Sequence, residues 1–182
     1  CGEGEREFLE LERLVFGSTD GSTLNIAATD DLFDPLTCIG GTIRTKDGVF
    51  EQTIDSRYPK SITSDKITAE VGALCEAHHC SLTVDLDMVP FYTDPAAEGI
   101  QTLVRTYNEY TGRNDQPYTI GGGTYARHFK AGGAFGPNDP HFPMPYWVGA
   151  EHSADEGFEE AQFKRALEIY IVSIARLMEL EF

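Results

Sequence analysis

Positive charge is scarce in this 182-residue chain, which carries 14 Lys and Arg residues against 30 Asp and Glu residues and has a formal net charge of −16. A surface this acidic repels the phosphate backbone of nucleic acids, so we expect no nucleic-acid partner. The sequence also lacks the run of about 20 apolar residues that a membrane span needs. It shows no secretory signal pattern. These absences predict a cytoplasmic protein with no membrane partner.

Cysteine is sparse as well, and none of the cysteines is paired in a C-x-x-C motif. The four cysteines are Cys1, Cys38, Cys75 and Cys80. In a chain without a secretory signal we expect them to be reduced thiols. The first residue is Cys1 rather than Met. We therefore expect a chain that begins partway through a longer protein or that has been trimmed.

The first half of the sequence alternates between helical and strand patterns. Apolar residues at helical spacing predict helices over residues 4–16 and 64–78, with a polar stretch at residues 17–34 after the first. Two β-prone runs flank Lys-Asp-Gly at residues 46–48, and Asp-Gly in that setting predicts a hairpin. Residues 81–90 alternate apolar and polar side chains, which is typical of a half-buried strand. The order α-β-β-α-β is that of a ferredoxin-like fold without its first strand.

The pattern changes near Asp94, where we place the boundary between a domain of residues 1–92 and a domain of residues 93–182. Amphipathic helices are predicted over residues 96–111 and from about Phe158 onward. The run AGGAFGP at residues 131–137 predicts a short buried strand. The side of the last helix that is expected to be buried carries Phe163, Leu167, Tyr170, Ile171, Ile174, Leu177 and Met178. The predicted fold class is α/β, with an α+β first domain.

The glycine-rich segment GGGTYAR, from Gly121 to Arg127, is the first candidate site. Three glycines let the backbone approach a ligand, and the Arg beside them can fork onto a carboxylate with two parallel hydrogen bonds. The segment alone fits a tight turn with a solvated Arg equally well. A phosphate loop is a weaker interpretation, because neither established glycine motif for phosphate is present.

His152 is the second candidate, in a glycine-containing loop just before the last helix. From such a loop one ring nitrogen can reach a metal ion, and a surface histidine is the alternative interpretation. Ser153 and Glu156 have the spacing of a helix capping box, which would give Glu156 a purely structural role.

The remaining histidines carry weaker signals. His78 and His79 lie near a helix end between two cysteines, but adjacent side chains on a helix point in different directions, which disfavours a zinc site. We assign no role to His128 or His141.

Taken in order, several of these segments resemble a known family. An Asp-x-Arg-Tyr-Pro run at residues 55–59 is followed by the glycine-rich segment, then by GGAFGP, and then by a loop histidine with Glu four residues later. In this order they resemble the PepV-type dipeptidases, which are relatives of carnosinases, aminoacylases and zinc carboxypeptidases. The resemblance runs from about Leu32 to the C-terminus.

The resemblance implies a two-domain zinc metallopeptidase that hydrolyses dipeptides or short peptides. Residues 1–92 would form most of a ferredoxin-like lid, and residues 93–182 would form the last, partial segment of the α/β catalytic domain. The intact enzyme of this family is expected to hold two zinc ions.

The resemblance also implies roles for individual residues. Arg127, with Gly122, Gly123 and Thr124 beside it, would bind the C-terminal carboxylate of the peptide substrate. His152 would be a ligand to one of the two zinc ions. The loop that carries His152 would be supported by Glu156.

The family's other zinc ligands and its catalytic base lie on segments that precede the residues seen here. We therefore expect this chain alone to be inactive, to hold no zinc by itself, and to have the missing N-terminal catalytic segment as its partner. The alternative function is that of a non-catalytic ferredoxin-like binding or dimerisation module. A third reading, other chemistry on the glycine-rich loop, lacks the support of a nucleophile beside a base.

Overall fold

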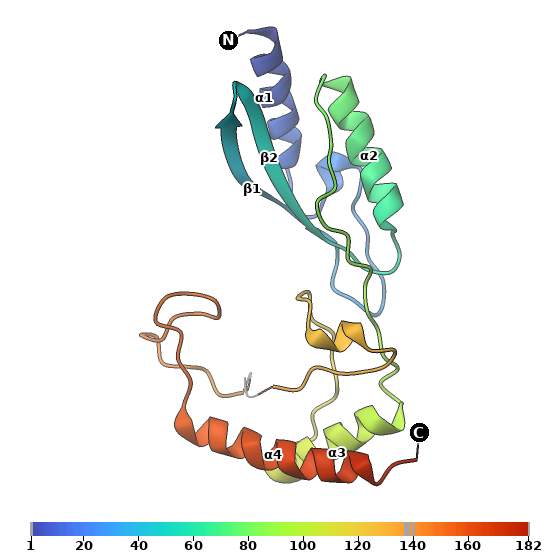
Figure 1. Ribbon diagram of the computed structural model, residues 1–182, viewed down its shortest axis with the longest axis vertical. Coiled ribbons are helices and arrows are strands. Elements are labelled where there is room, and N and C mark those ends of the chain that lie inside the picture. Colours follow the sequence, from blue (N-terminus) through green and yellow to red (C-terminus); the bar gives the residue numbers. More distant parts are fainter. Residues whose placement is uncertain (1, 137–138, 140, 182) are drawn as a thin grey trace. The chain divides into compact units, whose positions relative to one another are not determined.

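The computed structural model describes residues 2–136, 139 and 141–181. Within these residues the fold is mixed α/β, with four α-helices and a two-stranded antiparallel sheet (Figure 1). Among the described residues no helix is both long enough and apolar enough to cross a membrane.

The chain divides into two compact units. The first unit comprises Cys1–Phe91 and Thr119–Gly122, and the second comprises Tyr92–Tyr118 and Gly123–Phe182. The assignment of residues 1–92 to a lid and of residues 93–182 to a catalytic segment stays a prediction, and so does the ferredoxin-like topology.

A β-hairpin is the sheet of the first unit. Strands β1 (Thr37–Lys46) and β2 (Val49–Arg57) pair antiparallel on either side of a two-residue turn. The turn residues Asp47 and Gly48 have φ angles of 51° and 81°. Positive φ at both positions is what the tightest hairpin turns require, and Asp-Gly adopts it readily. The predicted hairpin is confirmed.

The core of the first unit is formed by two helices and the segment between α1 and β1. Helices α1 (Glu3–Val15) and α2 (Ser64–Ala77) match the predicted helices within one residue at each end. The least exposed core residues include Leu24, Ile26 and Leu36, each 1% exposed. The sequence pattern predicted only a polar stretch at residues 17–34. That prediction missed Leu24 and Ile26, which lie in the core. They come shortly after Gly21, whose backbone is left-handed (φ 75°).

The half-buried strand predicted over residues 81–90 is wrong for this chain. No residue of this segment is assigned to a strand. Its alternating apolar side chains, Leu82, Val84, Leu86 and Met88, are between 37% and 72% exposed. A strand needs a neighbouring strand to satisfy its backbone hydrogen bonds. The sheet of the described residues contains only β1 and β2. Residues 81–90 therefore have the sequence pattern of a strand but no neighbouring strand with which to pair.

Asp87 fixes the end of this segment by its side chain. Its carboxylate accepts a hydrogen bond from Tyr58 Oη at 2.9 Å and another from Ser64 Oγ at 2.7 Å. The segment is therefore anchored to the end of the hairpin and to the start of α2, although it joins no sheet.

Two helices packed against each other form the main body of the second unit. They are α3 (Glu98–Thr111) and α4 (Glu160–Met178). Two of the least exposed residues on these helices are small and polar: Thr106 on α3 is 0% exposed and Ser173 on α4 is 1% exposed. The apolar Ile169 on α4 is 4% exposed. Small side chains let two helix backbones approach closely. The buried Thr106 hydroxyl is hydrogen-bonded, whereas Ser173 Oγ has no hydrogen-bond partner among the described residues.

Arg176 crosses from α4 to α3. Its Nη1 donates to Thr106 Oγ1 at 3.0 Å, and its Nη2 lies 2.8 Å from Glu109 Oε2. Thr106 Oγ1 in turn donates to the Thr102 carbonyl at 2.8 Å. These contacts hold α4 in register on α3.

The buried side of α4 is not the side that the apolar pattern predicted. Five of the residues expected to be buried are instead between 53% and 81% exposed, and they are Phe163, Leu167, Ile171, Ile174 and Met178. The side that packs inward carries Gln162, Ile169 and Ser173. The prediction was wrong because the largest apolar stripe of the helix is not the one that meets α3.

The buried strand predicted over residues 131–137 is also wrong over residues 131–136, which form an irregular segment. Pro137 lies outside the described residues. Thr93 anchors the segment: its Oγ1 donates to the Gly132 carbonyl at 2.7 Å and accepts from the Gly132 N–H at 3.1 Å. A side-chain hydroxyl thus takes hydrogen bonds that a neighbouring strand would otherwise take.

Glu12 places a carboxylate inside the first unit. The residue is 8% exposed, and neither carboxylate oxygen has a hydrogen-bond partner among the described residues. Loss of hydration on burial raises the pKa of this carboxyl above its usual value of 4.5. The folded chain therefore binds the proton more tightly than the unfolded chain. Protonation of Glu12 therefore stabilises the folded chain below pH 4.5, and this stabilisation is lost as the pH rises through the pKa of Glu12 in the folded chain.

We expect Glu12→Leu to raise the free energy of unfolding of the chain at pH 7 by about 1–3 kcal/mol, the usual cost of a buried unsatisfied polar group. The gain should shrink at pH 4, where the wild-type carboxyl is protonated in the folded chain. Urea unfolding at both pH values measures it. Glu10→Leu is the control, since Glu10 pairs with Arg13 at the surface. An equal gain from Glu12→Leu at both pH values would contradict this account.

Candidate carboxylate and metal-ligand residues

Arg127 lies on the short 3-10 helix η2 (Tyr125–His128), directly after the glycine-rich run. Its backbone N–H donates to the Thr124 carbonyl at 3.3 Å. The Arg127 side chain is half-buried, whereas Tyr125 is 88% exposed. The turn therefore fixes the backbone from which the guanidinium extends, and Thr124 begins that turn in an extended conformation.

One glycine before this turn, Gly122, leaves space beside the backbone. A Cβ added at Gly122 would meet no atom within 4 Å. The division between the two units falls between Gly122 and Gly123. Within the first unit, Arg57 Nη1 donates to the Gly121 carbonyl at 3.4 Å. This contact joins two segments that carry the family resemblance, the Asp-x-Arg-Tyr-Pro run and the start of the glycine-rich segment.

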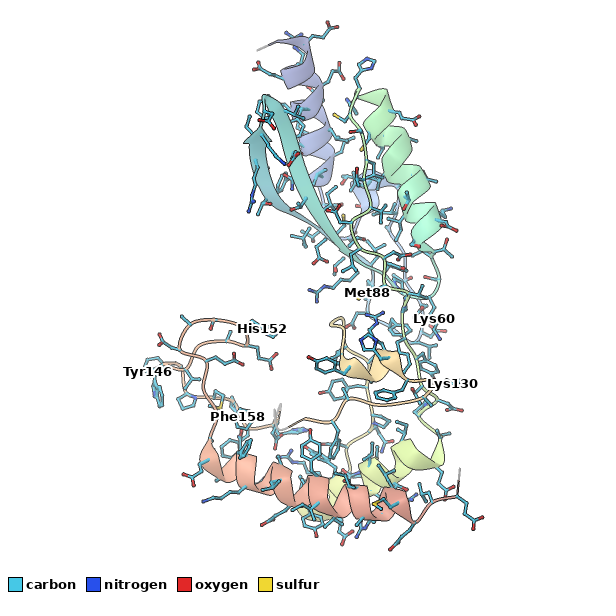
Figure 2. All side chains as sticks on the ribbon, viewed as in Figure 1. Lys60, Met88, Lys130, Tyr146, His152 and Phe158 are labelled. Carbon is cyan, nitrogen blue, oxygen red and sulfur yellow. The ribbon has the colours of Figure 1, made fainter. Side chains whose placement is uncertain are left out.

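His152 lies on a small closed loop that precedes α4. The loop is closed by the Gly149 N–H, which donates to the Asp155 carbonyl at 2.9 Å. His152 and Asp155 both have left-handed backbone, with φ angles of 64° and 63°. A side chain at Gly149 would overlap the Ala154 carbonyl oxygen, so this glycine is needed for closure. Figure 2 shows the imidazole of His152 projecting from the loop, where it is exposed to solvent.

Glu156 binds the backbone of the same loop. Its Oε2 accepts a hydrogen bond from the His152 N–H at 3.2 Å. The predicted capping box is wrong, because α4 begins at Glu160 with Glu159 at its N-cap. Ser153 Oγ donates instead to the Ala150 carbonyl at 2.6 Å. Glu156 is therefore a loop residue that constrains the backbone of His152.

The described residues do not by themselves fit a complete zinc site. They contain no group of three or more His, Cys, Asp and Glu side chains that could hold a metal ion. A catalytic zinc ion takes three protein ligands as a rule. If His152 binds zinc, the described residues do not supply the other ligands, and no catalytic step through a metal follows from these residues alone.

Two other histidines contact carboxylates in pairings that the sequence did not predict. His78 Nδ1 lies 3.1 Å from Glu7 Oε2 and links the end of α2 to α1. His141 Nε2 lies 3.2 Å from Asp115 Oδ2 in the second unit. Their partners lie 71 and 26 positions away along the chain, so no local sequence signal marks either pair.

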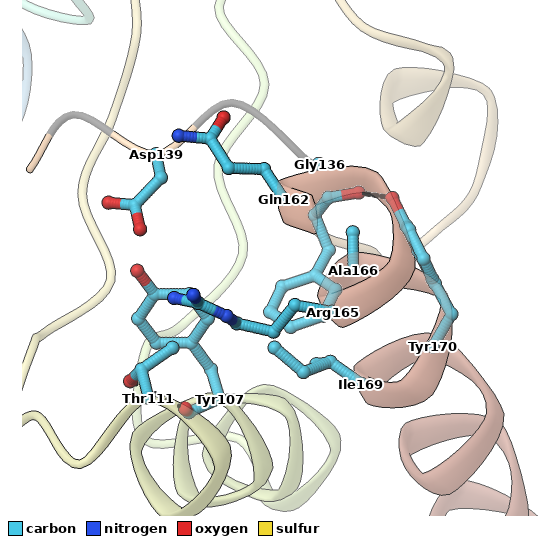
Figure 3. A pocket seen from close by; sticks show the side chains of 10 residues that line it. Tyr107, Thr111, Gly136, Asp139, Gln162, Arg165, Ala166, Ile169 and Tyr170 are labelled. Carbon is cyan, nitrogen blue, oxygen red and sulfur yellow. Dashed lines mark hydrogen bonds between the residues drawn. The ribbon is translucent and has the colours of Figure 1, made fainter. Parts of the chain in front are cut away.

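A pocket of the second unit lies where α3 and α4 meet the segment around Gly136. Its lining includes Tyr107, Thr111, Asp139, Gln162, Arg165 and Tyr170. Figure 3 shows Asp139 and Gln162 on one side of this pocket and Tyr107 and Thr111 on the other. The sequence pattern predicted burial for Tyr170 and assigned no role to the other five residues.

Arg113 organises one wall of this pocket. Its Nη1 donates to Asp139 Oδ1 at 2.7 Å and to Tyr107 Oη at 2.8 Å. Burial acts to raise the pKa of Asp139, but the hydrogen bonds from Arg113 and from the His141 backbone hold that pKa below its usual range. Asp139 is therefore a firmly charged partner of Arg113. These contacts give Arg113, Asp139 and Tyr107 a structural role in the pocket wall and do not indicate a catalytic one.

Comparison with known proteins shows that the chain is similar to several bacterial proteins named as putative dipeptidases. It is 32% identical over 166 residues to "Putative dipeptidase YtjP" of Bacillus subtilis, a match that covers 88% of this chain and 33% of the relative. It is 31% identical over 183 residues to a "Putative dipeptidase" of Staphylococcus epidermidis, covering 94% of this chain and 36% of the relative. No family model matches the chain.

The similarity supports a dipeptidase family. A further relative, from Staphylococcus saprophyticus, carries the same kind of name and is 29% identical over 91% of this chain and 34% of its own length. The chain thus spans about a third of the length of the relatives that it matches. The names of these relatives do not favour a non-catalytic binding module.

Proposed function

We propose that this chain is part of a zinc-dependent dipeptidase of the PepV type and contributes to the binding of its peptide substrate. The observation that carries this proposal is the similarity to dipeptidase-named proteins over about nine tenths of the chain. We further propose that this chain belongs to a polypeptide of the relatives' length, called the full-length protein below. Its remaining part would supply the catalytic base and the other zinc ligands.

The proposed role of Arg127 is to bind the free carboxylate at the C-terminus of the substrate. A guanidinium offers two parallel N–H groups that match the two oxygens of a carboxylate. One feature supports this role: the side chain extends from a backbone that the η2 turn fixes. Gly122, Gly123 and Thr124 would let the substrate terminus approach the backbone.

The proposed role of His152 is to provide one ligand to the zinc site. The closed loop limits the positions that the imidazole can reach, and the bond from its N–H to Glu156 restrains it further. When bound, zinc would polarise the scissile carbonyl. The residues of this chain would contribute one ligand, the restraint of that ligand and the carboxylate anchor.

This proposal predicts that the purified 182-residue chain does not hydrolyse dipeptides, with or without added zinc, because it lacks the base and most ligands. The full-length protein should hydrolyse them. Release of free amino acids from a panel of dipeptides measures both. Dipeptide turnover above background by the 182-residue chain would show that the catalytic groups lie within it, and no turnover by the full-length protein would refute the proposed activity.

A further inference from the structure

Two cysteines lie together at the end of α2. The helix ends at Ala77, and His79 then has a left-handed backbone with a φ angle of 54°. The Cys80 N–H donates to the Cys75 carbonyl at 2.8 Å, and the His79 N–H donates to the Glu76 carbonyl at 3.1 Å. These two bonds and the left-handed residue define a Schellman motif, which commonly brings the side chains of its first and last residues into contact. In this chain both of those residues are cysteines.

The backbone hydrogen bond between Cys75 and Cys80 also limits how far apart their Cα atoms can lie. With ordinary bond lengths, an N–H···O bond of 2.8 Å keeps the two Cα atoms within about 6.7 Å of each other. Disulfides join Cα atoms that are usually about 4.4–6.8 Å apart. The end of α2 therefore meets the main distance requirement for a disulfide between these cysteines without any change of backbone.

The two thiols differ in their access to solvent. Cys75 is 6% exposed and belongs to the core of the first unit. Cys80 is partly exposed and packs against that core, and its Sγ donates to the His78 carbonyl oxygen at 3.4 Å. Both are free thiols in the structure. A dissolved reagent can therefore reach Cys80 first, with Cys75 behind it.

We propose that Cys75 and Cys80 are a redox site that forms a reversible disulfide, with a low-molecular-weight disulfide as the oxidant. The Cys80 thiolate attacks one sulfur of the reagent, forms a mixed disulfide and releases one reagent thiolate. The Cys75 thiolate then attacks the Cys80 sulfur and releases the second reagent thiolate. The two protein thiols lose two electrons and two protons, and the reagent is reduced to two thiols. This chemistry does not depend on what the full-length protein hydrolyses.

Burial makes both thiols weaker acids than an exposed cysteine. It raises the pKa of Cys75, and the neighbouring Cys80 raises that pKa further. Burial also raises the pKa of Cys80, with further contributions from the Glu7 and Glu12 carboxylates of α1. Both side chains are therefore protonated at neutral pH, so their exchange with an external disulfide is slow. A thiolate of high pKa is also a poor leaving group, so external thiols open the protein disulfide slowly once it has formed.

The disulfide fixes the point at which the chain leaves α2. Residues 81–90 start directly after Cys80 and run back along the helix (Figure 1). Leu82 Cδ2 lies 3.9 Å from the position that a Cβ at Gly72 would occupy on α2. The Asp87 carboxylate anchors the other end of the segment by its two hydrogen bonds. Oxidation thus adds a covalent restraint at the end of the segment that Asp87 does not hold.

The test measures the oxidation state of the tryptic peptide of residues 67–105, which contains Cys75, Cys80 and no other cysteine. The folded full-length protein is equilibrated with several ratios of oxidised to reduced glutathione at mildly alkaline pH and is then quenched with acid. Remaining thiols are labelled with N-ethylmaleimide in denaturant. Mass spectrometry then distinguishes two labelled thiols, a mixed disulfide with glutathione and an internal disulfide. Cys38, which is 1% exposed on β1, is the internal control and should stay a thiol.

In the folded protein we expect the internal disulfide to exceed the mixed disulfide at least about tenfold, because the second thiol is held beside the first. Unfolding in urea at the same glutathione ratio should lower the yield of internal disulfide by about tenfold, since the turn at the end of α2 no longer holds the two residues together. Dithiothreitol should return the peptide to two labelled thiols.

Two variants, with folding verified by circular dichroism, separate the two steps. Cys75→Ala should leave a mixed disulfide of glutathione on Cys80, and Cys80→Ala should leave Cys75 largely unmodified. No internal disulfide in the folded wild type at any glutathione ratio would overturn the proposal and reduce the two cysteines to an apolar contact. An equal yield in the folded and the unfolded protein, or a disulfide from Cys38 to either cysteine, would overturn it as well. Each outcome holds whether or not the protein hydrolyses dipeptides.

Discussion

Arg127→Ala in the full-length protein is expected to lower kcat/KM for ordinary dipeptides by about 30-fold to 1000-fold. The physical reason is the loss of a charge-assisted, two-pronged contact to the substrate carboxylate, which costs on the order of 2–4 kcal/mol in transition-state binding. Steady-state hydrolysis of several dipeptides under conditions of low substrate measures this ratio directly.

Two further variants sharpen the interpretation of Arg127. Arg127→Lys should restore only part of the loss, because an ammonium group keeps the charge but lacks the planar fork. Lys130→Ala removes a positive charge from an exposed position three residues further on and should leave kcat/KM nearly unchanged. If Arg127→Ala had no more effect than Lys130→Ala, then Arg127 would be the solvated arginine of a tight turn.

His152→Ala in the full-length protein is expected to reduce the bound zinc and nearly abolish turnover while leaving the fold intact. Removing a ligand should cost more than the roughly 10–100-fold that follows from removing a contact behind a ligand. Zinc content by elemental mass spectrometry, activity and circular dichroism on the same sample separate these effects.

The matched control for His152 is His79→Asn. His79 is an exposed histidine after the end of α2, with a positive φ of 54°, and Asn tolerates that backbone conformation. This variant should keep both zinc and activity. Wild-type zinc content and activity in His152→Ala would identify His152 as an ordinary surface histidine.

The parts of the fold that follow from local sequence signals were predicted well. The hairpin depends on Asp47 and Gly48, whose turn conformation is encoded in the two residues themselves. The helices follow from apolar spacing, and α2 and α3 occur within two residues of their predicted bounds. Each of these elements satisfies its own backbone or pairs with its neighbour in the sequence.

The parts that failed depend on partners that local patterns do not specify. Residues 81–90 have the alternation of a strand, but a strand forms only beside another strand, and β1 and β2 pair with each other. The apolar pattern of α4 identified a face suited to burial, yet the face that packs on α3 carries Ser173 and Ile169. Periodicity predicts which side can be buried and does not predict what covers it.

The candidate site was predictable only in part for the same reason. Glycine beside Arg127 and the loop position of His152 are visible in the sequence, and their roles stay proposals. The hydrogen bond from His152 to Glu156 was not foreseen in its observed form, because the capping-box spacing suggested a helix start that lies further along the chain. The geometry of a loop depends on its backbone turns, which residue spacing alone does not fix.

The most direct test of the substrate proposal compares a dipeptide with its C-terminal amide, using wild-type full-length protein and Arg127→Ala. The amide keeps the scissile bond and removes the charge that Arg127 is proposed to bind. The wild type should prefer the free carboxylate in kcat/KM by about 30-fold to 1000-fold, and Arg127→Ala should lose most of that preference. A preference that persists undiminished in Arg127→Ala would contradict the assignment of Arg127 as the carboxylate anchor of a dipeptidase.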